Sequence, residues 1–149
     1  MKLSPNFQRS EFEKSGPMPD NCVPMYVRLC NEILEPIREH FGKAIRITSG
    51  YRSPEHNAAI GGSKTSQHVG TPTHCAADIQ IADTDIAEAF NWIRLHSMLP
   101  FDQAILEYGR AVESDLDDCI HLSYSIEPRR MAMVGATNNR APYVRVDVG

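Results

Sequence analysis

Three polar residues stand out by their types and surroundings. His68 lies in a loop rich in Gly, Ser, Thr and Pro, which leads into the apolar segment 76–81 that holds Asp78. His121 lies in a second apolar segment, 119–125. An isolated ionised carboxylate in a core is too costly to keep, so Asp78 needs a charged partner or a metal. Imidazole and carboxylate are ordinary zinc ligands, and two His with one Asp leave a fourth position for the water of a catalytic zinc.

The same residues have structural interpretations that spacing alone leaves open. A lone strand histidine such as His121 is more often a satisfied core or surface residue than a ligand. Asp78 taken alone is more typical of a salt-bridge partner. Three further histidines lie in predicted helical segments, have polar neighbours and are expected to be solvated; they are His40, His56 and His96.

Helices that frame these residues follow from apolar periodicity and capping signals. Apolar residues recur at helical spacing over 27–41, which predicts a helix bent near Pro36 and ended by Gly42. Ser53 before Pro54 predicts the cap of a short helix that reaches residue 60. Asp85 predicts the cap of a third helix, which runs toward Met98 and stops at Pro100.

Strand signals occur mostly in the second half of the chain. The predicted strands cover 45–49, 76–81, 101–108, 119–125 and 131–134. The late strands are close enough in sequence to form hairpins. We therefore predict an α+β fold with a small, mainly antiparallel sheet flanked by helices.

Composition limits the classes of protein that fit. The 149 residues are 42% hydrophobic and 23% charged, which predicts one domain over residues 1–149. A net charge of -4 disfavours binding to nucleic acid. No run of about 18 apolar residues occurs, so we expect no membrane span. Residues 1–15 are polar and charged with no apolar region, so we expect no signal peptide. We also expect a monomer. The cysteines form no C-x-x-C pair and are expected to be reduced thiols; they are Cys22, Cys30, Cys75 and Cys119.

Four short blocks of sequence follow one another in a specific order. They are TSGYRSP at 48–54, SQH at 66–68, AADI at 76–79 and IHLS at 120–123. One block alone is a weak signal, whereas the ordered set is specific. Together they resemble the zinc D-Ala-D-Ala carboxypeptidase family, which includes bacterial cell-wall carboxypeptidases and peptidoglycan-cleaving endopeptidases of bacteriophages. The likeness begins at Asn6 and reaches Ser125, so the motif-bearing core spans 6–125.

The resemblance implies roles for individual residues. The family pattern S-x-H, A-x-D and a strand His marks His68, Asp78 and His121 as the ligands of one Zn(2+) ion per chain. The arginine of the SGYRS motif is Arg52. Its family role is to bind substrate and to stabilise developing negative charge.

Neighbours of the implied ligands are candidates for contact with substrate. Ser66 and Gln67 belong to the motif of His68 and are expected to orient that ring and to line the site. Ser123 stands two positions after His121, so it shares a strand face with it and is expected to line the cleft.

Two departures from the family pattern affect these assignments. His68 and Asp78 are ten positions apart, farther than the corresponding pair in the family, as if residues had been added in 69–74. The addition makes His74 a competing ligand. The complete S-x-H motif favours His68, and a loop absorbs extra residues at little entropic cost. In addition, Cys119 replaces the Trp that usually stands two positions before the last His.

The general base has two candidates. Related enzymes carry an acid three positions before the last His, and Asp118 occupies that position. Strict alternation would point Asp118 to the opposite face, so a bulge at 117–118 would have to re-aim it. Glu107 is the rival because it is an acid on an apolar strand in a hairpin relation to His121. The acidic residues of 113–118 are otherwise typical of a solvated hairpin loop.

These features predict a zinc metallopeptidase that hydrolyses peptide bonds in peptidoglycan stem peptides, as a D,D-carboxypeptidase or as an endopeptidase. By analogy with bacteriophage endolysins, we expect cell-wall degradation from the host cytoplasm or from a virion. The missing Trp and the altered loop motivate an alternative, a catalytically inactive zinc-containing module that binds the cell wall or belongs to a virion. A thiol enzyme that pairs Cys75 with His74 is a weaker alternative because no third orienting residue is evident.

Overall fold

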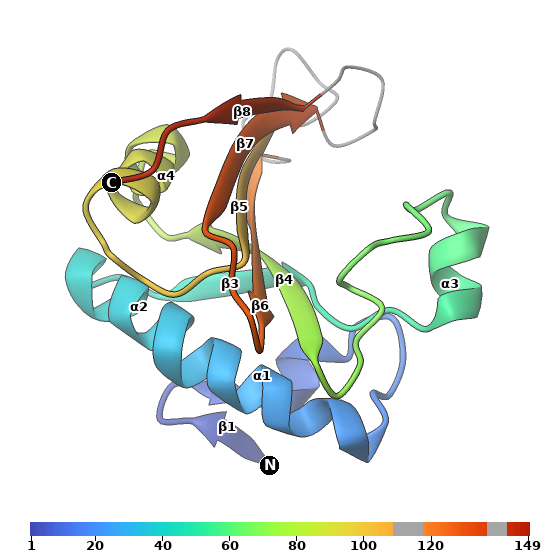
Figure 1. The fold of residues 1–149 in the computed structure, drawn as a ribbon. Helices are drawn as coiled ribbons and strands as arrows, with labels where there is room; N and C mark the ends of the chain where they lie inside the picture. Colours follow the sequence, from blue (N-terminus) through green and yellow to red (C-terminus); the bar gives the residue numbers. More distant parts are fainter. Residues whose placement is uncertain (109–117, 137–142) are drawn as a thin grey trace.

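A six-stranded sheet is the main element of the part of the chain that the structure describes (Figure 1). This computed structural model describes residues 1–108, 118–136 and 143–149. The strands lie in the order β3-β4-β6-β5-β7-β8. Their bounds are β3 Ile45–Ser49, β4 His74–Ile81, β5 Gln103–Tyr108, β6 Cys119–Ser125, β7 Met131–Ala136 and β8 Val144–Val146.

Most neighbouring strands in this sheet run antiparallel. The pairs β3–β4, β4–β6, β5–β6 and β7–β8 are antiparallel, whereas β5 and β7 are parallel. A separate antiparallel pair joins β1, Lys2–Ser4, to β2, Phe7–Gln8. The predicted α+β class with a mainly antiparallel sheet is confirmed. The sequence did not predict β1, β2 or β8, because strands of two or three residues carry almost no periodic signal.

The long helix predicted over 27–41 is a rod of three parts. It consists of α1, Val23–Leu29, a π-helical turn, Cys30–Leu34, and α2, Glu35–Phe41. The π turn lies directly before the predicted bend, where Pro36 has no N–H to continue the regular hydrogen-bond ladder. Gly42 ends the rod with a φ of 62°, a left-handed conformation that favours glycine. Two short 3₁₀ turns precede it, Arg9–Phe12 and Asp20–Cys22.

The two remaining helices begin at their predicted caps. The Ser53 hydroxyl accepts a hydrogen bond from the His56 N–H at the start of α3, Pro54–Ala59. The Asp85 carboxylate caps α4, Ile86–Leu95, in the same way. The predicted extension of α4 toward Met98 is wrong, because Met98 itself adopts a left-handed conformation that a right-handed helix cannot contain. Among the described helices, none has both the length and the apolar character that a membrane span requires.

The two faces of the sheet differ in what covers them. α1 contacts β4 and β6, and α4 contacts β5 and β6, whereas α3 and the loop after it lie on the side of the sheet opposite α4 (Figure 1). Along β4, Ala77 and Ile79 belong to the hydrophobic core. Because side chains alternate along a strand, Asp78 points to the opposite face. The predicted site therefore lies on the face that α3 approaches.

Candidate functional site

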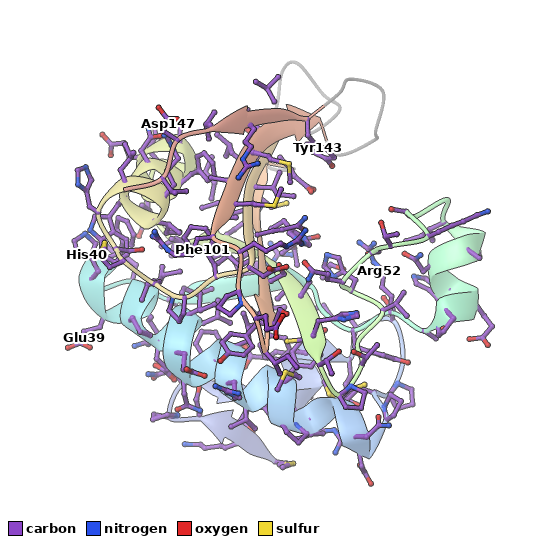
Figure 2. All side chains as sticks on the ribbon, viewed as in Figure 1. Glu39, His40, Arg52, Phe101, Tyr143 and Asp147 are labelled. Carbon is purple, nitrogen blue, oxygen red and sulfur yellow. The ribbon has the colours of Figure 1, made fainter. Side chains whose placement is uncertain are left out.

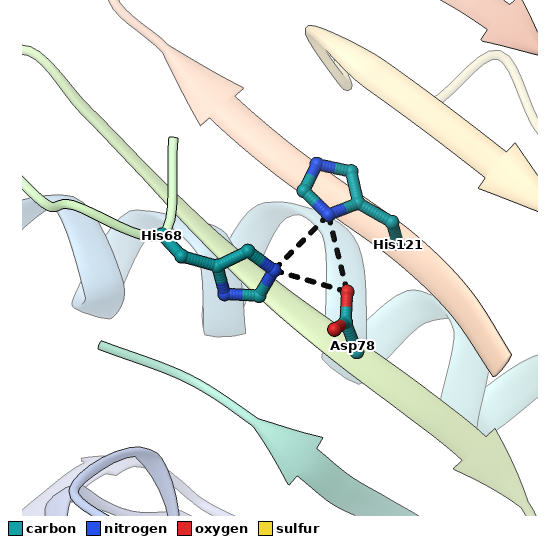
Figure 3. Close-up of side chains that lie close together, drawn as sticks. All are labelled: His68, Asp78 and His121. Carbon is teal, nitrogen blue, oxygen red and sulfur yellow. Dashed lines mark hydrogen bonds and ion pairs between the residues drawn. The ribbon is translucent and has the colours of Figure 1, made fainter. Parts of the chain in front are cut away.

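Two histidines and one aspartate form a buried triangle (Figure 3). His68 Nε2 and His121 Nδ1 each lie 3.1 Å from Asp78 Oδ1, and the two nitrogens are 3.2 Å apart. His68 comes from the loop after α3, Asp78 from β4 and His121 from β6. Asp78 and His121 are direct partners in the β4–β6 ladder, so the strand register sets their separation. The structure thus brings together the three residues predicted as ligands.

A backbone contact determines which nitrogen of His68 faces the triangle. His68 Nδ1 lies 2.7 Å from the Gly50 carbonyl oxygen, which can only accept, so Nδ1 is the donor. In its neutral form the ring therefore presents the Nε2 lone pair to Asp78 and His121, and in its protonated form it donates from Nε2 as well. Lone pairs at this distance repel one another unless a cation, either a shared proton or a metal ion, lies among them. A carbonyl partner on the far nitrogen is the usual arrangement of a metal-ligating histidine.

Gly50 can hold this carbonyl in place because it has no side chain. A Cβ at this position would lie 2.6 Å from the Phe12 main chain, and the next amide, that of Tyr51, donates to the Phe12 carbonyl. The close approach of two backbone segments requires glycine here. The glycine of the SGYRS motif therefore has a direct role in orienting His68.

The donor atoms of the triangle match a tetrahedral zinc ion. Zinc bonds of about 2.0 Å in a tetrahedron hold the ligand atoms about 3.3 Å apart. The three separations of 3.1 and 3.2 Å are close to this value. Two imidazoles and one carboxylate are also the chemistry that a catalytic zinc takes, with one position left for water. The residues present therefore fit zinc.

The pKa values of Asp78 and His121 also show that the triangle favours positive charge beside the Asp78 carboxylate. Burial raises the pKa of Asp78, but the charge of His68 and hydrogen bonds from both histidines outweigh it, so the pKa lies well below its usual value. Burial lowers the pKa of His121, but the hydrogen bond to Asp78 and its charge raise it overall. Arg52 adds positive charge, with Nη2 3.9 Å from Asp78 Oδ2.

Arg52 is tied to the triangle through both its main chain and its side chain. Its N–H donates to the His68 carbonyl at 2.9 Å, and its Nη2 donates to the Ser49 hydroxyl at 3.3 Å. The side chain lies on the α3 side of the sheet, where it lines a cavity (Figure 2). The guanidinium is therefore held beside the triangle, with the cavity in front of it.

The cavity has a volume of about 340 Å³ and reaches from the triangle across the sheet. Its floor includes Gln103, Ile105 and Glu107 of β5 and Met133 of β7, and glycine-rich segment 60–66 contributes to its wall. The register explains this floor, because Ile105 lies opposite both His121 and Met133. A peptide in this cavity would contact polar groups at the triangle and apolar side chains farther along the sheet.

Only one of the two candidate bases lines the cavity. Glu107 does, and its pKa is raised, first by burial and then by the negative charge of Asp78. Asp118 does not, and it precedes β6 with its carbonyl accepting a hydrogen bond from Gln80. The bulge expected at 117–118 and the other acidic loop residues fall outside the described residues, except for Asp118 itself.

A family comparison agrees with this geometry. The family model described as peptidase M15 matches residues 5–114, well over half of the chain. The chain belongs to the peptidase M15 family. This confirms the resemblance to zinc D-Ala-D-Ala carboxypeptidases. The matched range contains His68, Asp78, Arg52 and Glu107. His121 lies outside it, and the pairing of β4 with β6 brings this residue next to Asp78. No curated protein gives a significant match to the chain.

Ser66 and Gln67 support His68 from its own loop, and both line the cavity. The Ser66 hydroxyl accepts from the His68 N–H at 3.3 Å. Gln67 Nε2 donates to Asp102 Oδ2 at 2.7 Å. Asp102 is fully buried, and Arg129 donates to both of its oxygens, at 2.9 and 2.8 Å. The contacts of Gln67 and Arg129 with Asp102 therefore hold in place the loop after α3, which carries His68.

Asp102 and Arg129 are site residues that the local sequence did not predict. Burial raises the pKa of Asp102, but the hydrogen bonds from Arg129 and Gln67 lower it overall, so the carboxylate stays ionised. The available signal for Asp102 was its place directly after the apolar Phe101, since an acid next to a core residue needs a partner. No local pattern, however, connects it to Arg129, which is 27 positions away.

Ser123 and His74 lie outside the cavity lining. Ser123 is fully buried, and its hydroxyl accepts from the Gln103 N–H at 2.9 Å. This burial and this partner correct the expectation that Ser123 lines the cleft. His74 Nε2 lies 3.1 Å from the Val69 carbonyl and Nδ1 lies 3.2 Å from the Thr71 hydroxyl. His74 therefore closes the enlarged loop and takes no part in the triangle.

The thiol-enzyme alternative finds no support in the surroundings of Cys75. Its side chain is fully buried in the hydrophobic core, on the face opposite Asp78. Burial raises the pKa of this thiol well above its usual value, which disfavours the nucleophilic thiolate.

Proposed function

We propose that this member of the peptidase M15 family is a zinc-dependent peptidase that hydrolyses peptide bonds in peptidoglycan stem peptides. The observation that carries the proposal is the triangle of His68, Asp78 and His121, which lines a cavity together with a half-buried acid, Glu107. A metal site, an acid and an arginine around one cavity are the groups that peptide hydrolysis through an activated water requires.

His68, Asp78 and His121 would hold the metal through Nε2, Oδ1 and Nδ1. When bound, zinc acidifies a water molecule and polarises the scissile carbonyl. The hydrogen bond to Gly50 keeps the correct His68 nitrogen turned inward. Gln67, anchored on Asp102, and Ser66 keep the loop in place, so the ligand geometry is set before substrate binds.

Glu107 is the proposed general base. It takes the proton of the attacking water and delivers it to the nitrogen of the leaving amine. Burial and the neighbouring Asp78 raise its pKa, which makes the carboxylate a stronger proton acceptor than a solvated glutamate. Arg52 is proposed to bind a substrate carboxylate or the developing oxyanion through its guanidinium. The apolar floor at Ile105 and Met133 would receive small apolar side chains of the peptide.

Metal analysis combined with product analysis tests the proposal. Purified protein should carry about one zinc per chain, and it should release peptide fragments from muropeptides. Chelation should stop this release, and added zinc should restore it. The products also distinguish a D,D-carboxypeptidase, which frees a terminal D-alanine, from an endopeptidase, which divides the stem or the cross-link.

A protein that binds zinc and intact sacculi but cleaves neither sacculi nor muropeptides would contradict the proposal. That outcome would support the catalytically inactive wall-binding or virion module. Full hydrolysis by metal-free protein would contradict zinc dependence itself.

A further inference from the structure

Tyr143 contacts the proposed base from a distant part of the chain. Its hydroxyl donates to Glu107 Oε1 at 3.3 Å, across 36 positions in sequence. Tyr143 immediately precedes β8 and lies outside the segment 5–114 that the peptidase M15 family model matches. It lines the same cavity as Glu107, beside the end of β7 (Figure 2). No sequence motif connects these two residues.

The position of the Tyr143 ring depends on a glycine. Gly135 of β7 is the register partner of Glu107 in the parallel pair β5–β7. A Cβ added at Gly135 would collide with the Tyr143 ring, chiefly at Cδ1 and Cε1. The missing side chain therefore makes the space in which the ring lies over the sheet and reaches Glu107. The Tyr143 ring thus packs directly against Gly135, and its position depends on that residue.

The other oxygen of Glu107 also has a neighbour. Glu107 Oε2 lies 4.0 Å from the Cys119 thiol, and Cys119 is the register partner of Glu107 on β6. The carboxylate is thus held between a phenol on one side and a thiol on the other. Cys119 is also the position at which this chain departs from the Trp of the family pattern.

We propose that Tyr143 is a positioning residue that orients the Glu107 carboxylate for proton transfer. This inference rests on the proposed role of Glu107 as the general base. A free glutamate side chain samples several rotamers, and a displacement of about 1 Å in a catalytic group can cost about 100-fold in rate. The phenol removes that freedom and satisfies a half-buried carboxylate oxygen. The pKa of Tyr143 is raised to about 12 by burial and by the Glu107 charge, so its hydroxyl remains a donor at neutral pH.

The primary test is Tyr143→Phe in the zinc-loaded protein. This change keeps the ring over Gly135 and removes only the hydroxyl. We expect kcat to fall about 10- to 100-fold, while KM and the zinc content stay near the wild-type values. Tyr124→Phe is the matched control, because Tyr124 of β6 belongs to the hydrophobic core, and it should keep the wild-type kcat.

A second variant disturbs the hydrogen bond between Tyr143 and Glu107 without altering Tyr143 itself. In Gly135→Ala the new methyl group should push the ring away from Glu107, so kcat should fall in the same direction with zinc retained. This variant also keeps the inference testable if Tyr143→Phe folds poorly. A wild-type kcat in both variants would overturn the inference.

A double-mutant cycle separates positioning from a general structural role. If Tyr143 acts only through Glu107, Tyr143→Phe should cause no further loss in the Glu107→Gln background. An equal loss in both backgrounds would overturn the inference. If Glu107→Gln is inactive and Tyr143→Phe is fully active, only the inference fails. If Glu107→Gln keeps the wild-type rate, the assignment of the base fails, and the role proposed for Tyr143 fails with it.

Discussion

Glu107→Gln tests the proposed base with very little change in shape. The amide oxygen of Gln can still accept from Tyr143, but the side chain can no longer take up a proton. General acid and base groups contribute about 100- to 10,000-fold to rate, which corresponds to about 2.7 to 5.4 kcal/mol of activation free energy. We expect the loss in kcat on muropeptides to lie in this range. Zinc content should persist because Glu107 lies outside the triangle of His68, Asp78 and His121.

Asp118→Asn is the matched control for this substitution. It also converts a carboxylate to an amide, three positions before His121, but Asp118 does not line the cavity. We expect its kcat to stay close to the wild-type value. An inactive Asp118→Asn together with an active Glu107→Gln would refute the reasoning from cavity geometry and restore the motif-based assignment.

Stability as a function of pH gives an independent measurement on the same variant. Burial and the charge of Asp78 raise the pKa of Glu107 in the metal-free fold, so this fold holds the proton more tightly than the unfolded chain does. Ionisation of Glu107 therefore destabilises the folded state. The stability of metal-free wild type relative to Glu107→Gln should fall as pH rises above the ordinary Glu value of 4.5, and level off above the raised pKa. Calorimetric melting curves of both proteins measure this difference. A difference that does not change with pH would contradict it.

Three further predictions concern the metal and its supports. Chelation should lower the melting temperature as well as stop hydrolysis, and added zinc should restore both; an unchanged melting temperature would argue against a metal that ties the loop to two strands. His68→Ala should lose zinc in elemental analysis, whereas His74→Ala should retain it, and the reverse ranking would show that the enlarged loop moved the ligand. Asp102→Asn leaves Arg129 and Gln67 with a poorer acceptor, so chemical denaturation should show a loss of about 1 to 3 kcal/mol and zinc should bind more weakly. Wild-type stability and zinc affinity in Asp102→Asn would contradict the anchoring role.

The local sequence was sufficient to predict much of what surrounds the site. The caps at Ser53 and Asp85 and the stop at Gly42 depend on side chains and backbone preferences within a few residues, so they can be recognised without a fold. The strands β4 and β6 follow from their own apolar patterns. The identities of the three triangle residues came from motifs in the same way. Each of these features depends on neighbours in the chain.

Strand register, by contrast, was decided by the tertiary structure. Glu107 pairs with Cys119, which shares a face with His121, whereas Asp118 is displaced from His121 by an odd number of residues. Because successive strand side chains point to opposite faces, this register brings Glu107 rather than Asp118 to the cavity.

Contacts between distant segments required the fold as well. The parallel pairing of β5 with β7 puts Gly135 beside Glu107 and so makes room for Tyr143, and Asp102 meets Gln67 across 35 positions. Such contacts arise from how separate elements pack on one sheet, and packing leaves no periodic trace in either segment. The sequence by itself therefore determined which three residues are the candidate metal ligands and which elements carry them. Only the tertiary structure decided which acid, phenol and anchor surround them, because those choices depend on long-range register.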